Sequence, residues 1–129
     1  MYRVTHNSPS APAAIGPYSH AVRARDELLF ISGQIPIDPA TGELVGTTAA
    51  EQATQCLQNL HAIANDAGGS LEDAVKVTVY VTDIDAMPEV NQVYSLFFKS
   101  DPPARVALAV VALPKGALVE IDAVVALGG

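Results

Sequence analysis

Two charged residues stand out in the most apolar quarter of the chain. Arg105 lies in the apolar segment 103–107 and is the only ionised side chain between Asp101 and Lys115, while Glu120 lies in a second apolar segment, 119–123. Arginine stays charged and binds carboxylates through two parallel hydrogen bonds. The isolation of Arg105 therefore predicts a site for a small carboxylate-bearing ligand.

A structural role is the alternative for the same residues. Arg105 can form an ion pair with Glu120 or Asp122 if their strands are neighbours in a sheet. Strand alternation places Glu120 and Asp122 on one face, so either of them can be the functional carboxylate and the other a solvated charge. The sequence by itself leaves both readings open.

The elements that must position these residues follow from periodicity. Segments 22–25 and 28–32 are predicted to be strands of a hairpin around Asp26-Glu27, and 43–45 a short strand after turn-forming residues. Alternation of valine with polar residues over 75–82 predicts a strand with one fully buried face. The order of strands, helix, strand, helix and two strands predicts an α+β fold with both helices on one face of a sheet.

Two helices are predicted between these strands. Thr48 and Glu51 form a capping-box pattern, and Gly68-Gly69 ends the first helix. The second runs from about 86 to 99, with Asp85 as its cap and Pro88 in its first turn. The expected buried positions are Ala53, Leu57, Leu60, Ala64 and Ala67 in the first helix and Met87, Val90, Tyr94 and Phe97 in the second.

Composition limits the function classes. The 129 residues are expected to form a single domain, 1–129, that is 50% hydrophobic and only 16% charged, against about 25% charged in typical soluble domains. So few charges predict a homo-oligomer that buries apolar faces. Seven scattered basic residues against 14 acidic ones, a net charge of −7, argue against nucleic-acid binding.

Several site types and compartments are disfavoured. Cys56 is the single cysteine, and the three histidines share no metal-ligand spacing, so no disulfide or metal site is expected. A lone buried cysteine fits a reducing cytoplasmic setting. The chain contains no stretch of 18 apolar residues and no leader pattern in its first 20, so we expect neither a membrane span nor secretion.

Five short segments along the chain carry a family resemblance: 11–18 (APAAIGPY), 32–36 (SGQIP), Val90-Asn91 with Tyr94, 103–105 (PAR) and 119–121 (VEI). Together they resemble the RidA (YjgF/Rid) family of small imine and enamine deaminases over essentially the whole length. The resemblance implies a chorismate-mutase-like (YjgF-like) α+β fold that assembles as a homotrimer with sites between subunits. It also implies hydrolysis of 2-aminoacrylate, 2-iminopropionate and related imino acids to 2-oxo acids and ammonium, without a cofactor.

The resemblance also implies roles for individual residues. Arg105 binds the substrate carboxylate, Glu120 positions or deprotonates the attacking water, and Tyr18 closes the cleft and donates a hydrogen bond. These are the three expected catalytic residues. The expected substrate-binding residues are Ser32, Gly33, Asn91 and Ala107, the last through its backbone, because many relatives have cysteine at that position.

Other readings of these residues remain. Tyr18 can be a packing aromatic, Ser32 and Gly33 can simply turn the chain, and His20 after Tyr18 can alter which substrates fit. Three alternative functions would use the same cleft or the exposed apolar surface of the protein. They are a non-catalytic sensor of a small carboxylate such as a 2-oxo acid, a pathway-specific deaminase acting on an aminomuconate-type substrate, and a holdase that uses exposed apolar surface.

Overall fold

A computed structural model describes residues 1–128 of the protein. The longer elements follow in the order β1 (Tyr2–His6), β2 (Ala21–Arg25), β3 (Leu28–Gln34), α1 (Ala49–Asp66), β4 (Ala74–Val81), α2 (Met87–Phe97), β5 (Ala104–Ala109) and β6 (Val119–Ala126). Short 3₁₀ turns at Leu71–Asp73, Ile84–Ala86 and Pro114–Gly116 connect several of them.

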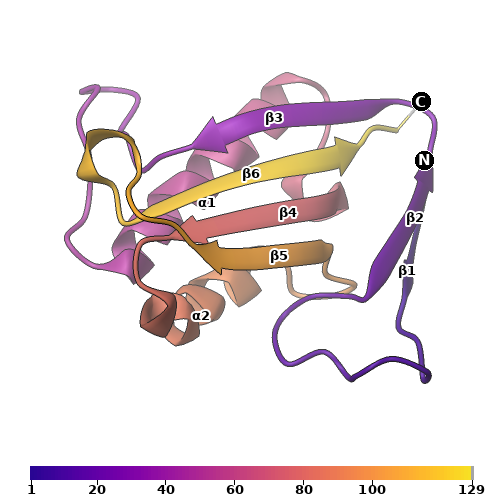
Figure 1. The fold of residues 1–129 in the computed structure, drawn as a ribbon. Helices are drawn as coiled ribbons and strands as arrows, with labels where there is room; N and C mark the ends of the chain where they lie inside the picture. The colour runs from indigo at the N-terminus through magenta and orange to yellow at the C-terminus, as the bar shows by residue number, and fades with distance from the viewer. Residues whose placement is uncertain (129) are drawn as a thin grey trace.

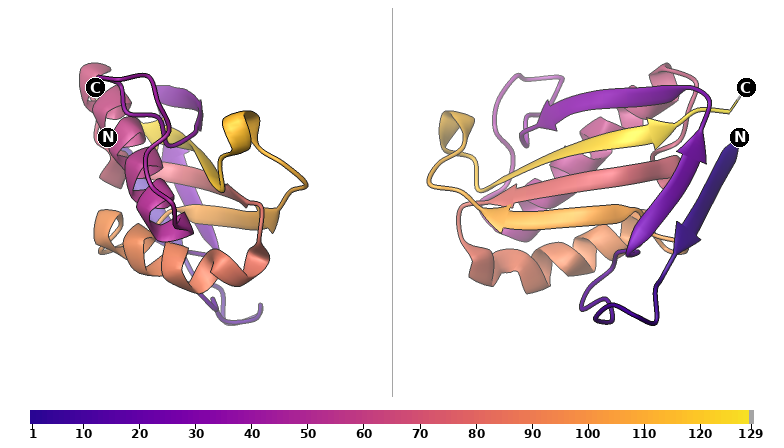
Figure 2. Two further views of the ribbon diagram at one scale, coloured as in Figure 1. Left: turned by 90° about the vertical axis from the view of Figure 1, so that its left-hand side faces the viewer. Right: turned by 45° about the vertical axis from the view of Figure 1, so that its right-hand side comes forward.

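The described chain forms two layers, a four-stranded mixed sheet and a pair of helices. The sheet has the order β3-β6-β4-β5, with β4 and β5 parallel and the other pairs antiparallel. Both helices lie behind this sheet in Figure 1, and the side view in Figure 2 shows its other face uncovered. The predicted α+β class, with two helices on one face, is confirmed. Within residues 1–128 neither helix is long and apolar enough to cross a membrane.

The valine alternation places β4 in the middle of the core. Val77, Val79 and Val81 are fully buried against the helices, as the alternation predicts. The pairing of β4 with β6 shifts register between Ala74 and Lys76, so Ala74 occupies the next buried position and Val75 is only partly covered. Strand β4 therefore has one apolar face against the helices and one face of mixed polarity on the open side.

Helix α1 begins as its capping signal predicts. The Thr48 hydroxyl accepts a hydrogen bond from the Glu51 backbone, and the Glu51 carboxylate accepts one from the Thr48 backbone. Four of the five predicted core positions are fully buried. The fifth, Ala67, is the exposed C-cap, because the helix ends at Asp66 and Gly68 follows with a positive φ of 84°.

Helix α2 is shorter than predicted, and its cap differs. Residues 84–86 form a separate 3₁₀ turn, in which the Asp83 carboxylate accepts from the Asp85 backbone. The prediction of Asp85 as the cap is therefore wrong, and the helix starts without a side-chain cap at Ala86. Pro88 lies in the first turn, where its missing N–H costs no hydrogen bond. Phe97 is half-buried, and Phe98 takes the buried position beyond Tyr94.

The predicted hairpin of 22–25 with 28–32 is wrong. Strand β2 pairs with β1, from Tyr2↔Arg25 to His6↔Ala21, whereas β3 pairs with β6. Asp26 has a φ of 73°, and this left-handed residue sends the chain out of one sheet into the other. Figure 1 shows the β1–β2 ribbon standing beside the end of the main sheet. Two strands that follow one another closely here belong to different sheets.

The predicted strand at 43–45 is also wrong. The segment forms one isolated bridge, Ile37↔Leu44, within a looped excursion between β3 and α1. Backbone hydrogen bonds from Asp38 to Glu43 and from Val45 to Pro36 close this excursion. The turn chemistry at 38–42 thus produces a compact loop with too few paired residues for a strand.

Candidate active site

Arg105 lies at the sheet edge formed by β5, among neutral groups of α2 and the N-terminal loop. Its Nη1 donates a 2.7 Å hydrogen bond to Asn91 Oδ1. Its Cζ lies 4.9 Å from the ring centroid of Tyr94 and 5.5 Å from that of Tyr18. Burial lowers the pKa of Arg105, and the electrostatic effects of Tyr94 and Tyr18 partly oppose this shift. The guanidinium is thus partly desolvated and held by an amide and two rings.

Two local features bring these groups together. Asn91 and Tyr94 are three residues apart on α2, a spacing that places both on the side of the helix that faces β5. Ser19 fixes the loop to the other side of Arg105: its backbone N–H donates to Pro103 O at 3.1 Å, and its hydroxyl donates to Pro102 O at 2.6 Å. Tyr18, the preceding residue, is thereby held beside the arginine.

The hydroxyl of Tyr18 keeps its own proton available. Its oxygen accepts a 3.3 Å hydrogen bond from the Ile15 backbone, and within residues 1–128 the O–H has no acceptor and can donate. Gly16 lets this loop come close, because a Cβ there would lie 3.1 Å from Arg105 Nη2. A turn between Tyr18 N and Gly16 O, 2.9 Å apart, completes the loop. The predicted pair Arg105 and Tyr18 therefore does meet.

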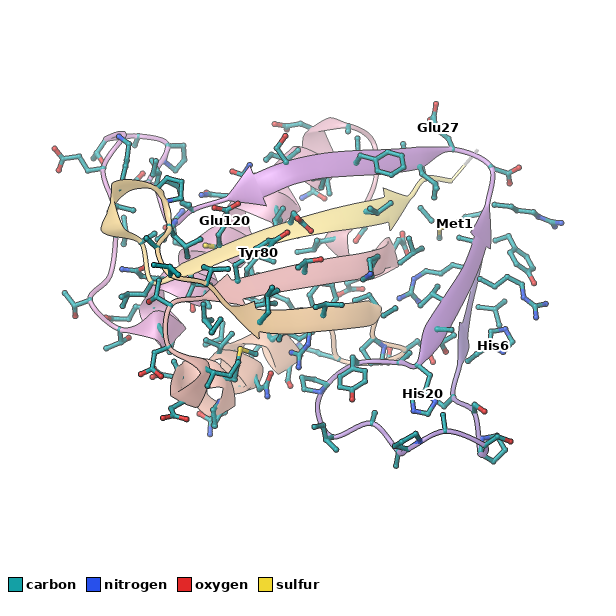
Figure 3. The ribbon with its side chains drawn as sticks, in the orientation of Figure 1. Met1, His6, His20, Glu27, Tyr80 and Glu120 are labelled. Atoms are coloured by element: carbon teal, nitrogen blue, oxygen red, sulfur yellow. The ribbon has the colours of Figure 1, made fainter. Side chains whose placement is uncertain are left out.

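Glu120 lies on the opposite, open face of the sheet. It belongs to β6, where Val119 and Ile121 are buried against the helices and Glu120 points away from them, toward the viewer in Figure 3. Ser32 and Gly33 form a bulge of β3 between the pairs Ile31↔Ala123 and Gln34↔Ile121. The Glu120 carboxylate rests on Gly33, where any Cβ would overlap it. Glycine at this position therefore leaves the room that the Glu120 carboxylate occupies, and a larger residue would displace that carboxylate.

Asp122 has a different environment on the same face. Its carboxylate accepts a 3.0 Å hydrogen bond from the Tyr80 hydroxyl, and this bond, with a smaller contribution from burial, raises the pKa of Tyr80. Glu120 and Tyr80 are both visible on the open face in Figure 3. The Asp122 carboxylate is thus hydrogen-bonded to a residue of the neighbouring strand, whereas the Glu120 carboxylate lies against Gly33.

The ion pair considered for Arg105 does not form. Strand β4 separates β5 from β6, so the expected neighbours are not adjacent. Arg105 is in register with buried Val77, which places it on the helix side, while Glu120 is in register with Tyr80 on the open side. The structure therefore gathers the expected site residues into two groups. Arg105, Tyr18, Asn91 and Ala107 form one, and Glu120, Ser32 and Gly33 form the other.

Ala107 shares the helix-side face with Arg105. It is in register with Val79, and its methyl group packs partly against the core. Strand β5 is the last strand of the sheet in the described chain, and Ser19 bridges to Ala104 at its start, so the outer side of the backbone beyond Ala104 is available to a ligand or a partner. This placement is compatible with a backbone role for Ala107.

His20 is used inside the N-terminal loop. Its Nδ1 accepts a 2.9 Å hydrogen bond from the Ser8 backbone, which requires the proton to be on Nε2, and Nε2 then donates to Pro12 O at 2.6 Å. The ring therefore ties the start of the loop to its middle. The contacts of His20 lie within this loop, and the loop continues into Tyr18 beside Arg105.

Cys56 is a buried core residue, as its position in α1 predicts. It is fully inaccessible, and its sulfur lies 3.6 Å from Val119 O. Burial, with a smaller effect from the Glu120 charge, raises the pKa of the Cys56 thiol to about 12. Because the thiolate is the nucleophilic form of cysteine, this thiol is poorly suited to catalysis.

Tyr94 is expected from the sequence as a buried helix residue and as part of a family-like segment, without a role in the arginine site. Its ring contacts the Arg105 guanidinium, which makes it part of the arginine site as well. The available signal was its spacing of three residues from Asn91, the residue already expected in the site. The position of an aromatic residue on the buried face of a helix does not indicate which side chain packs against its ring.

These features define a small α+β protein with a partly buried arginine at a sheet edge, backed by two helices. The chain belongs to the Ribonuc_L-PSP (YjgF/RidA) family, whose model, described as Endoribonuclease L-PSP, matches residues 8–127. The resemblance seen in the sequence is thereby confirmed.

Relatives and solved structures agree with this membership. The chain is 56% identical over 117 residues to the RutC family protein y4sK of Sinorhizobium fredii, covering 91% of this chain and 92% of that protein. It is 47% identical over 128 residues to the human 2-iminobutanoate/2-iminopropanoate deaminase, covering 99% and 93%. The crystal structure of RidA from the Antarctic bacterium Psychrobacter sp. PAMC 21119 matches with a TM-score of 0.76 and 41% identity, covering 96% of this chain and 99% of that one.

Proposed function

We propose that this protein is an imine deaminase that hydrolyses 2-iminopropanoate, 2-iminobutanoate and related imino acids to 2-oxo acids and ammonium. The proposal is supported by the names of relatives such as the human deaminase, which aligns over nearly the whole chain. It is also supported by the chemistry of the two groups of residues described above. The reaction is a hydrolysis and needs no cofactor, and the single buried cysteine fits a cytoplasmic protein.

The main support for the proposal is the environment of the Arg105 guanidinium. Within residues 1–128 its hydrogen bond goes to a neutral amide, and the groups that act on its charge are the two tyrosines. A partly desolvated guanidinium with unused N–H donors binds a carboxylate more strongly than an exposed one. Imino acids and 2-oxo acids both carry such a carboxylate next to the reacting carbon. Arg105 therefore holds the substrate by the end that does not react.

The Arg105 group and the Glu120 group have different roles in the proposed reaction. The enamine 2-aminoacrylate first gains a proton on carbon and loses one from nitrogen, which gives the imine. Water then adds to the C=N carbon, and the carbinolamine expels ammonia to leave the 2-oxo acid. Glu120 orients the water and takes its proton, and Tyr18 donates a hydrogen bond from its free O–H. We assign the amino end to the backbone around Ser32 and Gly33 of one subunit and to the amide nitrogen of Asn91 of another.

Completion of the site requires a second copy of the chain. Arg105 and Glu120 leave the sheet on opposite faces, so one protomer does not bring them together. The open face of the sheet also exposes apolar side chains, with Phe30 74% and Val106 46% exposed. A homotrimer that covers this face brings the Arg105 group of one subunit to the Glu120 group of the next. The low charge content of the chain agrees with such an assembly.

The test measures ammonia and 2-oxo acid release from imines generated in situ, with the spontaneous rate as reference. We expect acceleration by the protein and its loss in Arg105→Ala. Arg25→Ala is the matched control, because Arg25 also stacks on a tyrosine, Tyr2 at 4.5 Å, but lies in β2. The loss corresponds to one or two charged hydrogen bonds, about 10- to 100-fold in kcat/KM.

The same experiment separates the other functions. A sensor binds 2-oxobutanoate through Arg105 but releases no ammonia above the spontaneous rate. A pathway-specific deaminase leaves these small imines untouched and acts on a larger unsaturated amino acid. A holdase suppresses aggregation of a client protein equally well with and without Arg105. Each of these results contradicts the proposed activity on small imino acids.

A further inference from the structure

We propose that Tyr94 is a positioning residue of the arginine site, whose ring face fixes the orientation of the Arg105 guanidinium for carboxylate binding. The inference rests on the proposed function only in identifying that carboxylate as the substrate's. It assigns a role in binding to a residue that is fully buried in α2.

The contact has the geometry of a cation–π interaction. The Arg105 Cζ lies 4.9 Å from the centroid of the Tyr94 ring, closer than the 5.5 Å to the ring of Tyr18. A guanidinium over an aromatic face is held more strongly where water is excluded, and Tyr94 is inaccessible to solvent. The ring is enclosed in the core, where Phe98 is one of its neighbours, with ring centroids 4.6 Å apart. Tyr94 is therefore a rigid support under a flexible side chain.

The hydroxyl of Tyr94 takes no part in this support. It is buried and has no hydrogen-bond partner within residues 1–128. Removing it leaves the ring face in place and relieves an unpaired buried polar group. The proposal therefore makes opposite predictions for two substitutions at one position. Tyr94→Phe keeps the support, and Tyr94→Leu removes it.

Loss of the support affects binding more than chemistry. Asn91 Oδ1 accepts from one nitrogen of the guanidinium, and a single hydrogen bond still allows the group to rotate. The Tyr94 ring restricts that rotation, so the remaining N–H donors stay aligned for a carboxylate. The groups that move protons, Glu120 above all, do not touch Tyr94. A change in KM or Kd with an almost constant kcat is the signature of this role.

The experiment compares wild type, Tyr94→Phe, Tyr94→Leu and the control Phe98→Leu. Phe98 packs on Tyr94, so its substitution disturbs the same part of the core without removing the ring. Binding of 2-oxobutanoate is measured by calorimetry, and KM and kcat are measured with the imine generated in situ. We expect Tyr94→Leu to weaken binding about 3- to 30-fold with kcat changed less than about twofold. Tyr94→Phe and Phe98→Leu should bind within about twofold of wild type, although Phe98→Leu should melt at a lower temperature.

A second measurement reports the geometry without turnover. The Arg105 side-chain N–H resonance, assigned by its loss in Arg105→Lys, is expected at an upfield position because of the ring currents. The shift that remains in Tyr18→Leu is due to Tyr94. This chemical shift is measured on proteins that keep Tyr94. It therefore tests the contact between Arg105 and the Tyr94 ring even if Tyr94→Leu does not fold. An Arg105 resonance at its random-coil position in Tyr18→Leu overturns the proposal.

The remaining outcomes are distinct. Wild-type binding by Tyr94→Leu overturns the positioning role, and equal losses in Tyr94→Leu and Phe98→Leu reduce it to general packing. A loss in Tyr94→Phe as large as that in Tyr94→Leu assigns the role to the hydroxyl and overturns the proposal as stated. If the wild type binds 2-oxobutanoate with the expected pattern but hydrolyses no imine, the proposed function fails and the role of Tyr94 stands.

Discussion

Arg105 and Glu120 leave the four-stranded sheet on opposite faces, with strand β4 between their strands. The register Arg105↔Val77 places the arginine on the helix side, and Tyr80↔Glu120 places the carboxylate on the open side. Alternate residues of a strand point to opposite faces of the sheet, so the position of each residue within its strand determines this separation. The proposed chemistry therefore needs two copies of the chain.

Substitution of Glu120 by glutamine separates proton transfer from binding. Glu120→Gln keeps the size of the side chain over Gly33 but removes its ability to accept a proton. We expect kcat to fall about 10²- to 10⁴-fold with little change in the Kd for 2-oxobutanoate. The control is Asp122→Asn, on the same strand face and bonded to Tyr80, which should retain kcat within about threefold. Equal losses in both variants contradict the assignment.

Gly33→Ala tests the close approach of β3 to the carboxylate. The new Cβ overlaps the Glu120 carboxylate, so the side chain must move away from its position. We expect a kcat close to that of Glu120→Gln while the circular-dichroism spectrum and oligomeric state are unchanged. The double variant should be no worse than either single variant, because both act through one group. Additive losses in this cycle contradict the contact.

Strong local periodicity allowed the central elements to be predicted from sequence. The valine alternation identified β4, and the capping box identified the start of α1, because each signal depends on neighbouring residues only. The hairpin at 22–32 was predicted wrongly, since strand pairing depends on contacts far apart in sequence. Residues 2–6, which pair with β2, carried no such signal.

The site residues too were identified correctly from local segments, whereas the arrangement of the strands that carry them was not. Segment similarity pointed to Arg105, Tyr18 and Asn91, and the structure places them in contact through α2 and the Ser19 anchor. The considered ion pair with Glu120 required β5 and β6 to be neighbours. Their actual separation by β4 follows from the parallel β4–β5 pairing across α2, which periodicity does not reveal.

The capping box gives a pH-dependent contribution to stability. Hydrogen bonds from the backbone N–H groups of Thr47 and Thr48 lower the pKa of Glu51 below its ordinary value of 4.5. A depressed folded-state pKa stabilises the fold fully above the unfolded-state value, and the stabilisation is lost as the pH falls through the folded-state value. Glu51→Gln should therefore lower Tm at pH 7 and have less effect below pH 4.5.

Thr48→Ala removes the other half of the box and should cost about 1 kcal/mol, or about 3–4 °C in Tm at fixed protein concentration. Thermal melts from pH 3 to 8 check both variants. An effect of Glu51→Gln that grows as the pH falls would contradict the assigned direction of its pKa shift.

The charge of the chain argues against RNA as a substrate, although the matching family model is described as an endoribonuclease. Binding to a phosphate backbone depends on clustered basic residues, and this chain carries 7 basic and 14 acidic residues. We expect no retention of single-stranded RNA at low salt and no cleavage by protein purified from a nuclease-deficient host. Cleavage that follows the protein through purification and is lost in Arg105→Ala contradicts this expectation.

Subunit complementation is the most direct test of the central claim, that Arg105 of one copy acts with Glu120 of another. Arg105→Ala and Glu120→Gln proteins, each expected to retain at most about a tenth of wild-type activity alone, are unfolded together in equal amounts, refolded and assayed for imine hydrolysis. In random mixtures of the proposed trimer, about a quarter of the interfaces combine an intact Arg105 with an intact Glu120. We predict activity of about a quarter of wild type after mixing, above the residual activity of either variant refolded alone. Correctly assembled mixed oligomers with no more than this residual activity would show that both residues must belong to one chain, and the account would be wrong.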